Sequence, residues 1–335
     1  TMASLMNTHD ATEHALLAIR DPHARPHAAA DWRVRLDLLR AELRTHSRVI
    51  VAYSGGVDSS VLLRVAHEQL GERALGVIGV SDSYASRELQ LALDQAARFG
   101  ARVEVVTTGE LTNPDFASNP DDRCYHCKKE LYSKLARIAA RERCDVVLDG
   151  TIADDLSDWR PGRRAAAEID VRSPLADIGF RKLDVRAVAE AFELTSAAKP
   201  ASPCLASRIP YGTPITRESL SQVERAEGLL RELGFAELRV RLAVDKHGDT
   251  ARIEVPLADL VRLAAPGLRE RVTAGLKELG FRWVTLDLEG LRSGNLNPPQ
   301  QQVGLLAHNS GTATPSMGNN QCAPDGGGGT TRDLR

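Results

Sequence analysis

The sequence lacks an excess of charge of either sign. Its 335 residues contain 43 Lys and Arg against 45 Asp and Glu, which gives a formal net charge of -2. Non-specific binding to nucleic acid requires many contacts between basic side chains and phosphates, and a nearly neutral chain has to concentrate them locally. We therefore expect no nucleic-acid partner and a small-molecule substrate.

Long hydrophobic runs are also missing. No stretch approaches the roughly 20 apolar residues that cross a bilayer, and residues 1–10 show no apolar segment of the signal-peptide kind. These absences predict a cytoplasmic protein without membrane contact. Because thiols stay reduced in that compartment, the five cysteines are expected to serve packing, metal binding or catalysis rather than disulfides.

Neither end of the chain carries a sustained apolar period. Residues 1–30 are rich in Ala and His, and residues 293–335 are rich in Asn, Pro, Gln and Gly. Such segments cannot bury enough apolar surface to offset their chain entropy. We expect both ends to be disordered, Cys322 included.

Short β-branched runs alternate with helical patterns between residues 31 and 200. The expected strands are 48–53, 74–80, 102–107 and 145–148, and the expected helices are 57–70, 87–99, 125–141 and 182–192. Strands separated by helices of this length imply right-handed crossovers. The pattern predicts an α/β fold with a doubly wound parallel sheet and helices on both of its faces.

The texture changes after residue 200. A helix at 217–233 precedes strands at 237–244 and 251–255, helical segments follow over 257–279 with a break at Pro266 and Gly267, and a last strand is expected at 281–288. This order predicts a smaller C-terminal α+β domain over residues 201–292.

The strongest motif lies between the first strand and the first helix of the alternating region. It reads Ser54-Gly55-Gly56-Val57-Asp58-Ser59-Ser60. The two glycines let the backbone approach an anion, and the helix start offers unpaired N–H groups and the positive end of a dipole. The serines can donate further hydrogen bonds. Because phosphate repels Asp58, we expect a Mg²⁺ ion between the two.

This loop is not a Walker A loop, since it lacks the lysine of G-x-x-x-x-G-K-[ST]. It resembles the SGGxDS loop of the ATP pyrophosphatase superfamily, the PP-loop or adenine nucleotide alpha hydrolase-like fold. That resemblance implies that the loop holds the leaving pyrophosphate of ATP while a substrate oxygen attacks the α-phosphorus. Residues 54–60 are then the ATP-binding residues, and Asp58 is a catalytic residue.

Cys124 and Cys127 form a C-x-x-C pair at the start of an expected helix, next to basic residues that favour thiolate. The pair alone leaves a redox couple, half a zinc site or no function open. Cys204 follows in a polar loop with three prolines at the expected domain junction, which is a usual place for chemistry.

Three segments together resemble the LarE family of ATP-dependent sulfur transferases over residues 48–290. They are Asp149–Arg163, Ser173–Leu175 and Lys199–Thr216. The family adenylates carboxylates of pyridinium-3,5-biscarboxylic acid mononucleotide and converts them to thiocarboxylates for the nickel-pincer nucleotide cofactor. The resemblance implies that this chain acts on the same mononucleotide and receives sulfur from sulfide or from a sulfide-delivering protein. It also implies a homo-oligomer and a catalytic sulfur site at Cys204.

The family has two sources of sulfur. Some members give up the sulfur of the cysteine that matches Cys204; others add a C-x-x-C and bind a [4Fe–4S] cluster with three cysteines. Cys124, Cys127 and Cys204 match the second kind, and three thiolates with one open iron suit a cluster that exchanges a ligand. We favour the cluster and keep the sacrificial route open. Cys144 is interpreted as a core residue, and His126 as an exposed polar residue.

Arginines alternate with apolar residues in the expected strand 237–244. Arg239 and Arg241 share one face, and two guanidinium groups at that spacing can grip one phosphate. A solvated face with weak ion pairs fits the pattern equally well. The resemblance favours the phosphate of the mononucleotide. We further expect five residues near the substrate or a metal: Ser207, Arg208, Glu227, Arg252 and Glu254.

Other functions remain open within the same superfamily. Transfer RNA thiolation predicts a basic surface, and amide formation leaves three cysteines unexplained. A nucleotide-regulated binding module keeps the loop but needs no sulfur site.

Overall fold

A computed structural model describes residues 31–157, 161–200 and 202–292. The disorder expected for both ends concerns residues outside these described ranges, namely 1–30 and 293–335 with Cys322. Residues 158–160 of the Asp149–Arg163 segment also lie outside them. None of the described helices combines the length and the apolar character that crossing a bilayer requires.

The centre of the alternating region is a four-stranded parallel sheet with the order β3-β2-β1-β4. Its strands are β1 (Val49–Ala52), β2 (Ala74–Val80), β3 (Arg102–Thr107) and β4 (Val146–Leu148). β1 pairs with β2 on one side and with β4 on the other, both in parallel. The carboxyl ends of these two central pairs therefore meet at one edge of the sheet, where α/β proteins bind ligands.

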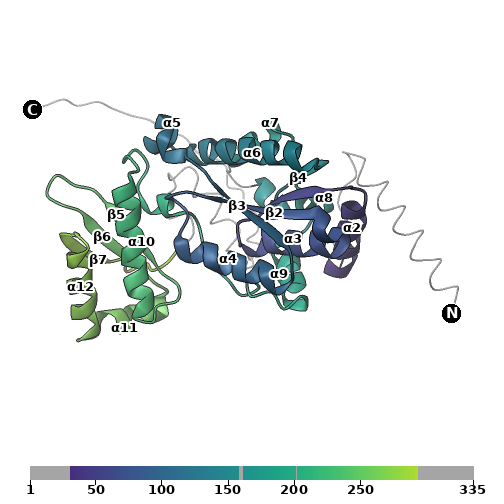
Figure 1. Cartoon of the computed structure of the whole chain (residues 1–335). Helices are drawn as coiled ribbons and strands as arrows, with labels where there is room; N and C mark the ends of the chain where they lie inside the picture. The colour runs from purple at the N-terminus through teal and green to yellow at the C-terminus, as the bar shows by residue number, and fades with distance from the viewer. Residues whose placement is uncertain (1–30, 158–160, 201, 293–335) are drawn as a thin grey trace, which may run out of the picture. The chain divides into compact units, whose positions relative to one another are not determined.

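Helices cover both faces of this sheet (Figure 1). Val49 and Val51 belong to one hydrophobic core, whereas Ile50 and Ala52 belong to another on the opposite face. The first core is formed with α2 (Trp32–Arg44), α3 (Val57–Leu70), α4 (Ser86–Arg98), α8 (Pro174–Ile178) and α9 (Lys182–Ala191). The second core is formed with α6 (Arg123–Glu142) and α7 (Gly162–Glu168). The predicted doubly wound α/β sheet is confirmed.

A second, mixed sheet follows with the order β5-β6-β7. Its strands are β5 (Arg239–Ala243), β6 (Thr250–Glu254) and β7 (Trp283–Leu286), with β5 antiparallel and β7 parallel to β6. The helices α10 (Arg217–Glu232), α11 (Leu260–Ala264) and α12 (Leu268–Glu278) accompany it. The chain breaks between α11 and α12, where Gly267 adopts φ 81°, as the sequence predicts.

The remaining helical elements are short. They are α5 (Pro114–Ala117) and the 3-10 helices η1 (Gly71–Arg73), η2 (Glu110–Thr112), η3 (Ala153–Ser157), η4 (Leu205–Arg208) and η5 (Leu257–Asp259). Phe116 of α5 is buried in the hydrophobic core of the mixed sheet, so that core takes a side chain from well before residue 200. The domain boundary near residue 200 stays a prediction.

Candidate active site

The turn after β1 is shaped by Gly55. This residue has φ 71°, and a Cβ atom built on it lies 2.6 Å from the Cβ of Ala92 in α4. Both the backbone conformation and the packing therefore require glycine here. The turn leads directly into α3, which begins at Val57 and directs its unpaired N–H groups toward the carboxyl edge of the sheet.

The serine hydroxyls of this turn form an internal network. The Oγ of Ser59 accepts a hydrogen bond from the Ser54 amide at 3.2 Å and lies 3.2 Å from the Ser54 hydroxyl. Ser60 is fully buried, donates to the Gly56 carbonyl at 2.7 Å and accepts from Nε2 of Gln95 at 2.6 Å. The exposed Ser54 thus lies at the open side of the turn, whereas the buried Ser59 and Ser60 hydroxyls donate to the Gly56 carbonyl and support the turn from within.

Asp58 has a basic partner that the sequence did not indicate. Nζ of Lys182 donates to both carboxylate oxygens of Asp58, at 2.8 and 2.7 Å. Lys182 is the first residue of α9, and its backbone amide is fixed by Oδ2 of Asp154 at 2.8 Å. The negative charge that would repel a phosphate is therefore compensated by this ammonium group.

The loop after β4 packs against the same helix start. A Cβ atom added to Gly150 would lie 2.8 Å from the backbone nitrogen of Ser59. The preceding Asp149 is buried and accepts hydrogen bonds from the hydroxyls of Tyr132 at 2.9 Å and Ser173 at 2.7 Å. These contacts hold the Asp149–Thr151 segment next to the phosphate turn.

The three candidate sulfur residues differ in environment. Cys124 and Cys204 are exposed, whereas Cys127 is half-buried and donates to Oε1 of Glu110 at 3.3 Å. Burial, together with the negative charges of Glu110 and Cys204, raises the pKa of Cys127 well above its usual value. At neutral pH this shift favours the thiol form of Cys127 over the thiolate.

The predicted metal site is not preformed. Within residues 31–157, 161–200 and 202–292, no three His, Cys, Asp or Glu side chains lie together in an arrangement that could hold a metal ion. The number and softness of the thiols suit iron and sulfide, but their placement does not yet match a cluster site.

Of two interpretations of neighbouring residues, the one for His126 needs correction and the one for Cys144 agrees with its packing. His126 was expected to be exposed, but its side chain is only 18% exposed and lies 3.5 Å from Oδ1 of Asp122, because it follows that residue by one helical turn. Cys144 is half-buried and packs at the margin of the core beneath α6.

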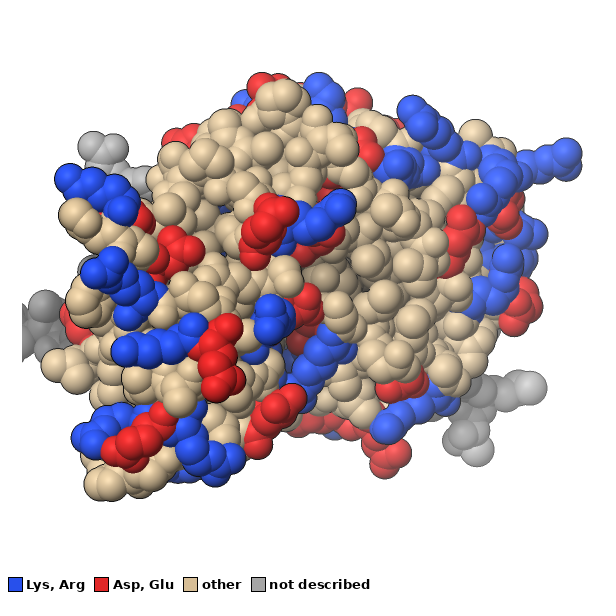
Figure 2. Space-filling view, turned by 60° about the vertical axis from the view of Figure 1, so that its left-hand side comes forward, with Lys and Arg blue, Asp and Glu red and all other residues tan. Residues whose placement is uncertain are grey.

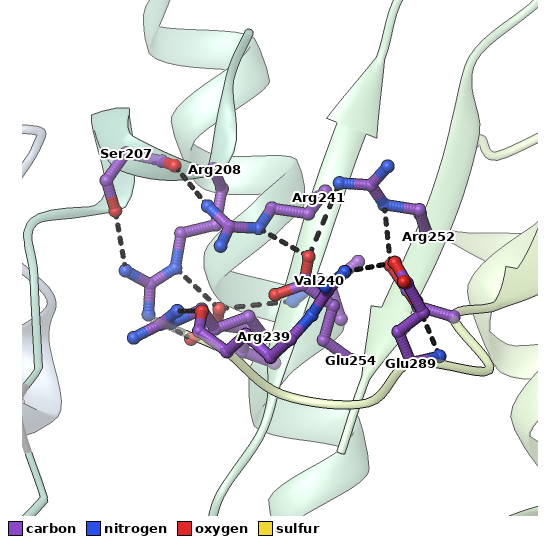
Figure 3. A network of polar contacts seen from close by, with 11 residues as sticks. Ser207, Arg208, Arg239, Val240, Arg241, Arg252, Glu254 and Glu289 are labelled. Atoms are coloured by element: carbon purple, nitrogen blue, oxygen red, sulfur yellow. Dashed lines mark hydrogen bonds and ion pairs between the residues drawn. The ribbon is translucent and has the colours of Figure 1, made fainter. Parts of the chain in front are cut away.

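A buried network of arginines and carboxylates lies where η4, α10 and the mixed sheet meet (Figure 3). Glu227 of α10 accepts from Nε of Arg208 at 2.8 Å and from Nη2 of Arg231 at 2.8 Å. It also accepts from the amide of Val240 at 3.3 Å. Arg208 and Glu227 are almost inaccessible to solvent, at 4% and 2% side-chain exposure. Glu227 therefore serves first as the counter-charge of two guanidinium groups.

The face of Arg239 and Arg241 is buried, so the alternative of a solvated face is wrong. Nε of Arg241 donates to Oε1 of Glu254 at 3.0 Å, and its Nη1 donates to the Ser207 carbonyl at 2.6 Å. Arg252, directly opposite Arg241 in the antiparallel register, binds the same Glu254 oxygen at 3.3 Å. The five residues Ser207, Arg208, Glu227, Arg252 and Glu254 thus belong to one network with the two strand arginines.

Arg239 differs from the other arginines of this network. Its Nη1 donates to the carbonyl of Arg292 at 2.7 Å, and it forms no ion pair within the described residues. Burial, followed by the positive charges of Arg241 and Arg208, lowers its pKa. Glu254 and Glu227 attract Arg239 without forming an ion pair with it, and a buried cation that lacks a close counter-charge is costly. The geometry of the network therefore suits an anionic group such as phosphate.

Known proteins resemble this chain over most of its length. The chain is 42% identical over 260 residues to a pyridinium-3,5-bisthiocarboxylic acid mononucleotide synthase of Lactiplantibacillus plantarum, covering 77% of this chain and 92% of that protein. It is 42% identical over 263 residues to an uncharacterized protein of Synechocystis sp., covering 78% and 97%. It is 31% identical over 249 residues to an uncharacterized protein of Methanocaldococcus jannaschii, covering 74% and 92%.

No protein-family model matches the chain. The similarity to the Lactiplantibacillus protein extends over nearly all of that synthase. The chain belongs to the LarE family, the family of this synthase.

Proposed function

We propose that the chain is an ATP-dependent sulfur transferase that converts carboxylates of pyridinium-3,5-biscarboxylic acid mononucleotide to thiocarboxylates, for the nickel-pincer nucleotide cofactor. The observation that carries this proposal is the 42% identity to the Lactiplantibacillus synthase over 92% of its length. In this proposal the buried arginines and the phosphate turn would supply the two anion sites that such a reaction needs.

In the first half-reaction, a carboxylate oxygen of the substrate attacks the α-phosphorus of ATP and pyrophosphate leaves. The turn Ser54–Ser59 and the amino end of α3 would bind the β- and γ-phosphates through N–H groups and hydroxyls. Asp58 would hold Mg²⁺, and Lys182 would move from the Asp58 carboxylate toward the phosphates as the ion binds. Activation is necessary because a carboxylate is a poor electrophile.

Arg239 and Arg241 would bind the phosphate of the mononucleotide. Arg239 has hydrogen-bonding capacity left, whereas Arg241 is held by Glu254 and Ser207 and so presents a fixed positive charge. Guanidinium groups recognise phosphate by paired N–H donors. Ser207, Arg208, Glu227, Arg252 and Glu254 would orient these two side chains.

In the second half-reaction, a sulfur nucleophile attacks the acyl-adenylate carbonyl and AMP leaves. The finer proposal is that Cys124, Cys127 and Cys204 hold a [4Fe–4S] cluster, which when bound supplies a sulfide at its open iron. The presence of three thiols that are free of disulfides supports it. Cluster assembly would have to remove the Cys127 proton and bring the cysteines into register.

A sacrificial route is the second candidate. The exposed Sγ of Cys204 would attack the activated carbonyl, and loss of the Cα proton with cleavage of the Cβ–Sγ bond would leave a thiocarboxylate and dehydroalanine. Anaerobic reconstitution with iron and sulfide separates the routes. Brown protein that is bleached by Cys124→Ala or Cys127→Ala supports the cluster, and colourless protein whose mass falls by one H₂S after turnover supports the sacrificial route.

The adenylation proposal is tested by product analysis. With ATP, Mg²⁺ and the pyridinium dicarboxylate, the products should be AMP and pyrophosphate, and Asp58→Ala should abolish AMP formation without unfolding the chain. ADP and orthophosphate would contradict the proposal. In Figure 2, basic and acidic side chains are intermixed on the left and along the right margin of the visible face, with a broad uncharged area between, so this face lacks the uniformly basic surface that transfer RNA thiolation predicts. The homo-oligomer and the cytoplasmic location stay predictions.

A further inference from the structure

Asn119 occupies an unusual place between α5 and α6. Its side chain is fully buried, and its backbone adopts φ 59°, a left-handed conformation that asparagine tolerates better than most residues. It lies just before the helix that begins with Arg123 and carries the C-x-x-C pair. Nothing in the proposed reaction uses it, so its burial requires another explanation.

The amide of Asn119 reaches the loop that carries Cys204. Its Nδ2 donates to the carbonyls of Pro210 at 2.8 Å and Thr213 at 2.9 Å. Its own backbone carbonyl accepts from the amide of Gly212 at 2.9 Å. A buried amide that satisfies two carbonyls of one loop fixes the position of that loop, because leaving them unpaired is costly.

The other end of the Asn119 side chain is tied to the cysteine helix. Its Oδ1 accepts from Nη1 of Arg123 at 2.8 Å, and the Arg123 guanidinium lies 4.4 Å from the centre of the Tyr211 ring. Arg123 directly precedes Cys124, and Tyr211 lies in the Cys204 loop. Burial raises the pKa of the Tyr211 hydroxyl, and the neighbouring Arg123 guanidinium opposes that rise.

We propose that Asn119 and Arg123 form a clamp that holds the Cys204 loop against the start of α6, so that Cys204 and Cys124 are presented at one place. Both are positioning residues: they act through the cysteines and touch no substrate. The proposal rests on the proposed sulfur transfer for its purpose. The hydrogen bonds on which it rests join the Cys204 loop to the start of α6, and the clamp would serve either source of sulfur.

The clamp is tested by cross-linking the two exposed thiols with dibromobimane. A background with Cys127→Ser, Cys144→Ser and Cys322→Ser leaves Cys124 and Cys204, and the reduced, metal-free protein should form the cross-link rapidly. Asn119→Asp tolerates the same φ but places an oxygen against the two loop carbonyls. We expect its cross-linking rate to fall about tenfold, as expected for one or two lost buried hydrogen bonds.

Asn119→Gly is the second variant, since glycine accepts φ 59° without strain and adds no charge. It should slow cross-linking to a similar extent. The matched control is Asn113→Asp, because Asn113 caps α5 through the amide of Asp115 and touches no part of the Cys204 loop within the described residues. AMP formation, measured with the cysteines intact, should stay near the parent level in all three variants.

Three outcomes would overturn the clamp. They are cross-linking of both Asn119 variants within twofold of the parent rate, an equal slowing in Asn113→Asp, and a parallel loss of AMP formation, which would indicate a role in overall stability. Failure of the parent chain to form any thiocarboxylate would contradict the proposed function and leave the cross-linking result intact.

Discussion

Replacement of Glu227 by glutamine distinguishes a structural role of this residue from a role in binding the substrate. Glu227 is 1% exposed and is the carboxylate partner of Arg208 and Arg231. Glutamine has nearly the same shape but no charge, so the variant leaves Arg208 buried as an uncompensated cation. Removing one partner of a buried pair costs about 3–5 kcal/mol of folding free energy.

This loss is large enough to measure by thermal unfolding. At about 2–4 °C per kcal/mol for a unit of this size, the midpoint for Glu227→Gln should fall by roughly 6–20 °C at pH 7. Glu232→Gln is the matched control, because Glu232 is exposed on the same helix and should change stability by no more than about 0.5 kcal/mol. Circular dichroism at the helical band follows both transitions.

The difference between parent and variant should depend on pH. Burial alone would raise the pKa of Glu227, but the charges and hydrogen bonds of Arg208 and Arg231 outweigh it and hold that pKa below its usual value. A carboxylate with a lowered pKa stabilises the fold fully above its unfolded pKa of about 4.3. That stabilisation is lost as the pH falls through the folded pKa, so the two melting curves should converge in acid.

A Glu227→Gln variant as stable as the parent at pH 7 would refute this reasoning. If such a variant also lost affinity for the mononucleotide while AMP formation at saturating substrate persisted, Glu227 would belong to the substrate site. If thermal stability and affinity for the mononucleotide fell together, the structural role of Glu227 as the counter-charge of Arg208 and Arg231 would stand.

Three further substitutions probe the phosphate turn, the strand arginines and the loop after β4, and a fourth serves as a control. Lys182→Met should lower the rate of AMP formation about 10–100-fold, the value of one charge-assisted contact, without changing the melting midpoint by more than a few degrees; unchanged kinetics would remove Lys182 from the site. Arg239→Met should weaken mononucleotide binding by a similar factor in calorimetry and leave ATP binding intact, and equal losses for both ligands would contradict its assignment. Gly150→Ala adds a methyl group 2.8 Å from the Ser59 nitrogen. It should lower the free energy of unfolding by about 1–3 kcal/mol and should also abolish AMP formation. Gly228→Ala, at a helical site with open space, should instead be neutral or stabilising by up to about 1 kcal/mol.

Much of the α/β region could be predicted from local pattern. β2 and β3 have the bounds that their β-branched runs predict, because each run ends at residues that favour turns. The helices α5 and α8 were missed since segments of four or five residues are too short to show a period of 3.6. α2 was also missed, although its buried leucines lie on one face of thirteen helical residues.

The phosphate turn could be predicted because its residues are adjacent in the sequence, whereas its partners could not. Lys182 forms an ion pair with Asp58, although the two residues are 124 positions apart in the sequence. Glu110 accepts from Cys127 because the chain between β3 and α6 folds back to bring them together. No local pattern distinguishes such a lysine from a solvated one. These contacts depend on how the elements pack, which is the part of the fold that periodicity leaves undetermined.

The strand arginines show the limit of period-two reasoning. The pattern correctly predicts that Arg239 and Arg241 share a face, but it does not say what covers that face. In the structure the cover is polar: Arg208, Glu227 and the Ser207 carbonyl form a second layer over β5. A buried charge in such a layer is stable only with a counter-charge. Because Arg239 has no carboxylate partner within the described residues, the site most in need of an anion is the one that the proposed reaction assigns to the substrate phosphate.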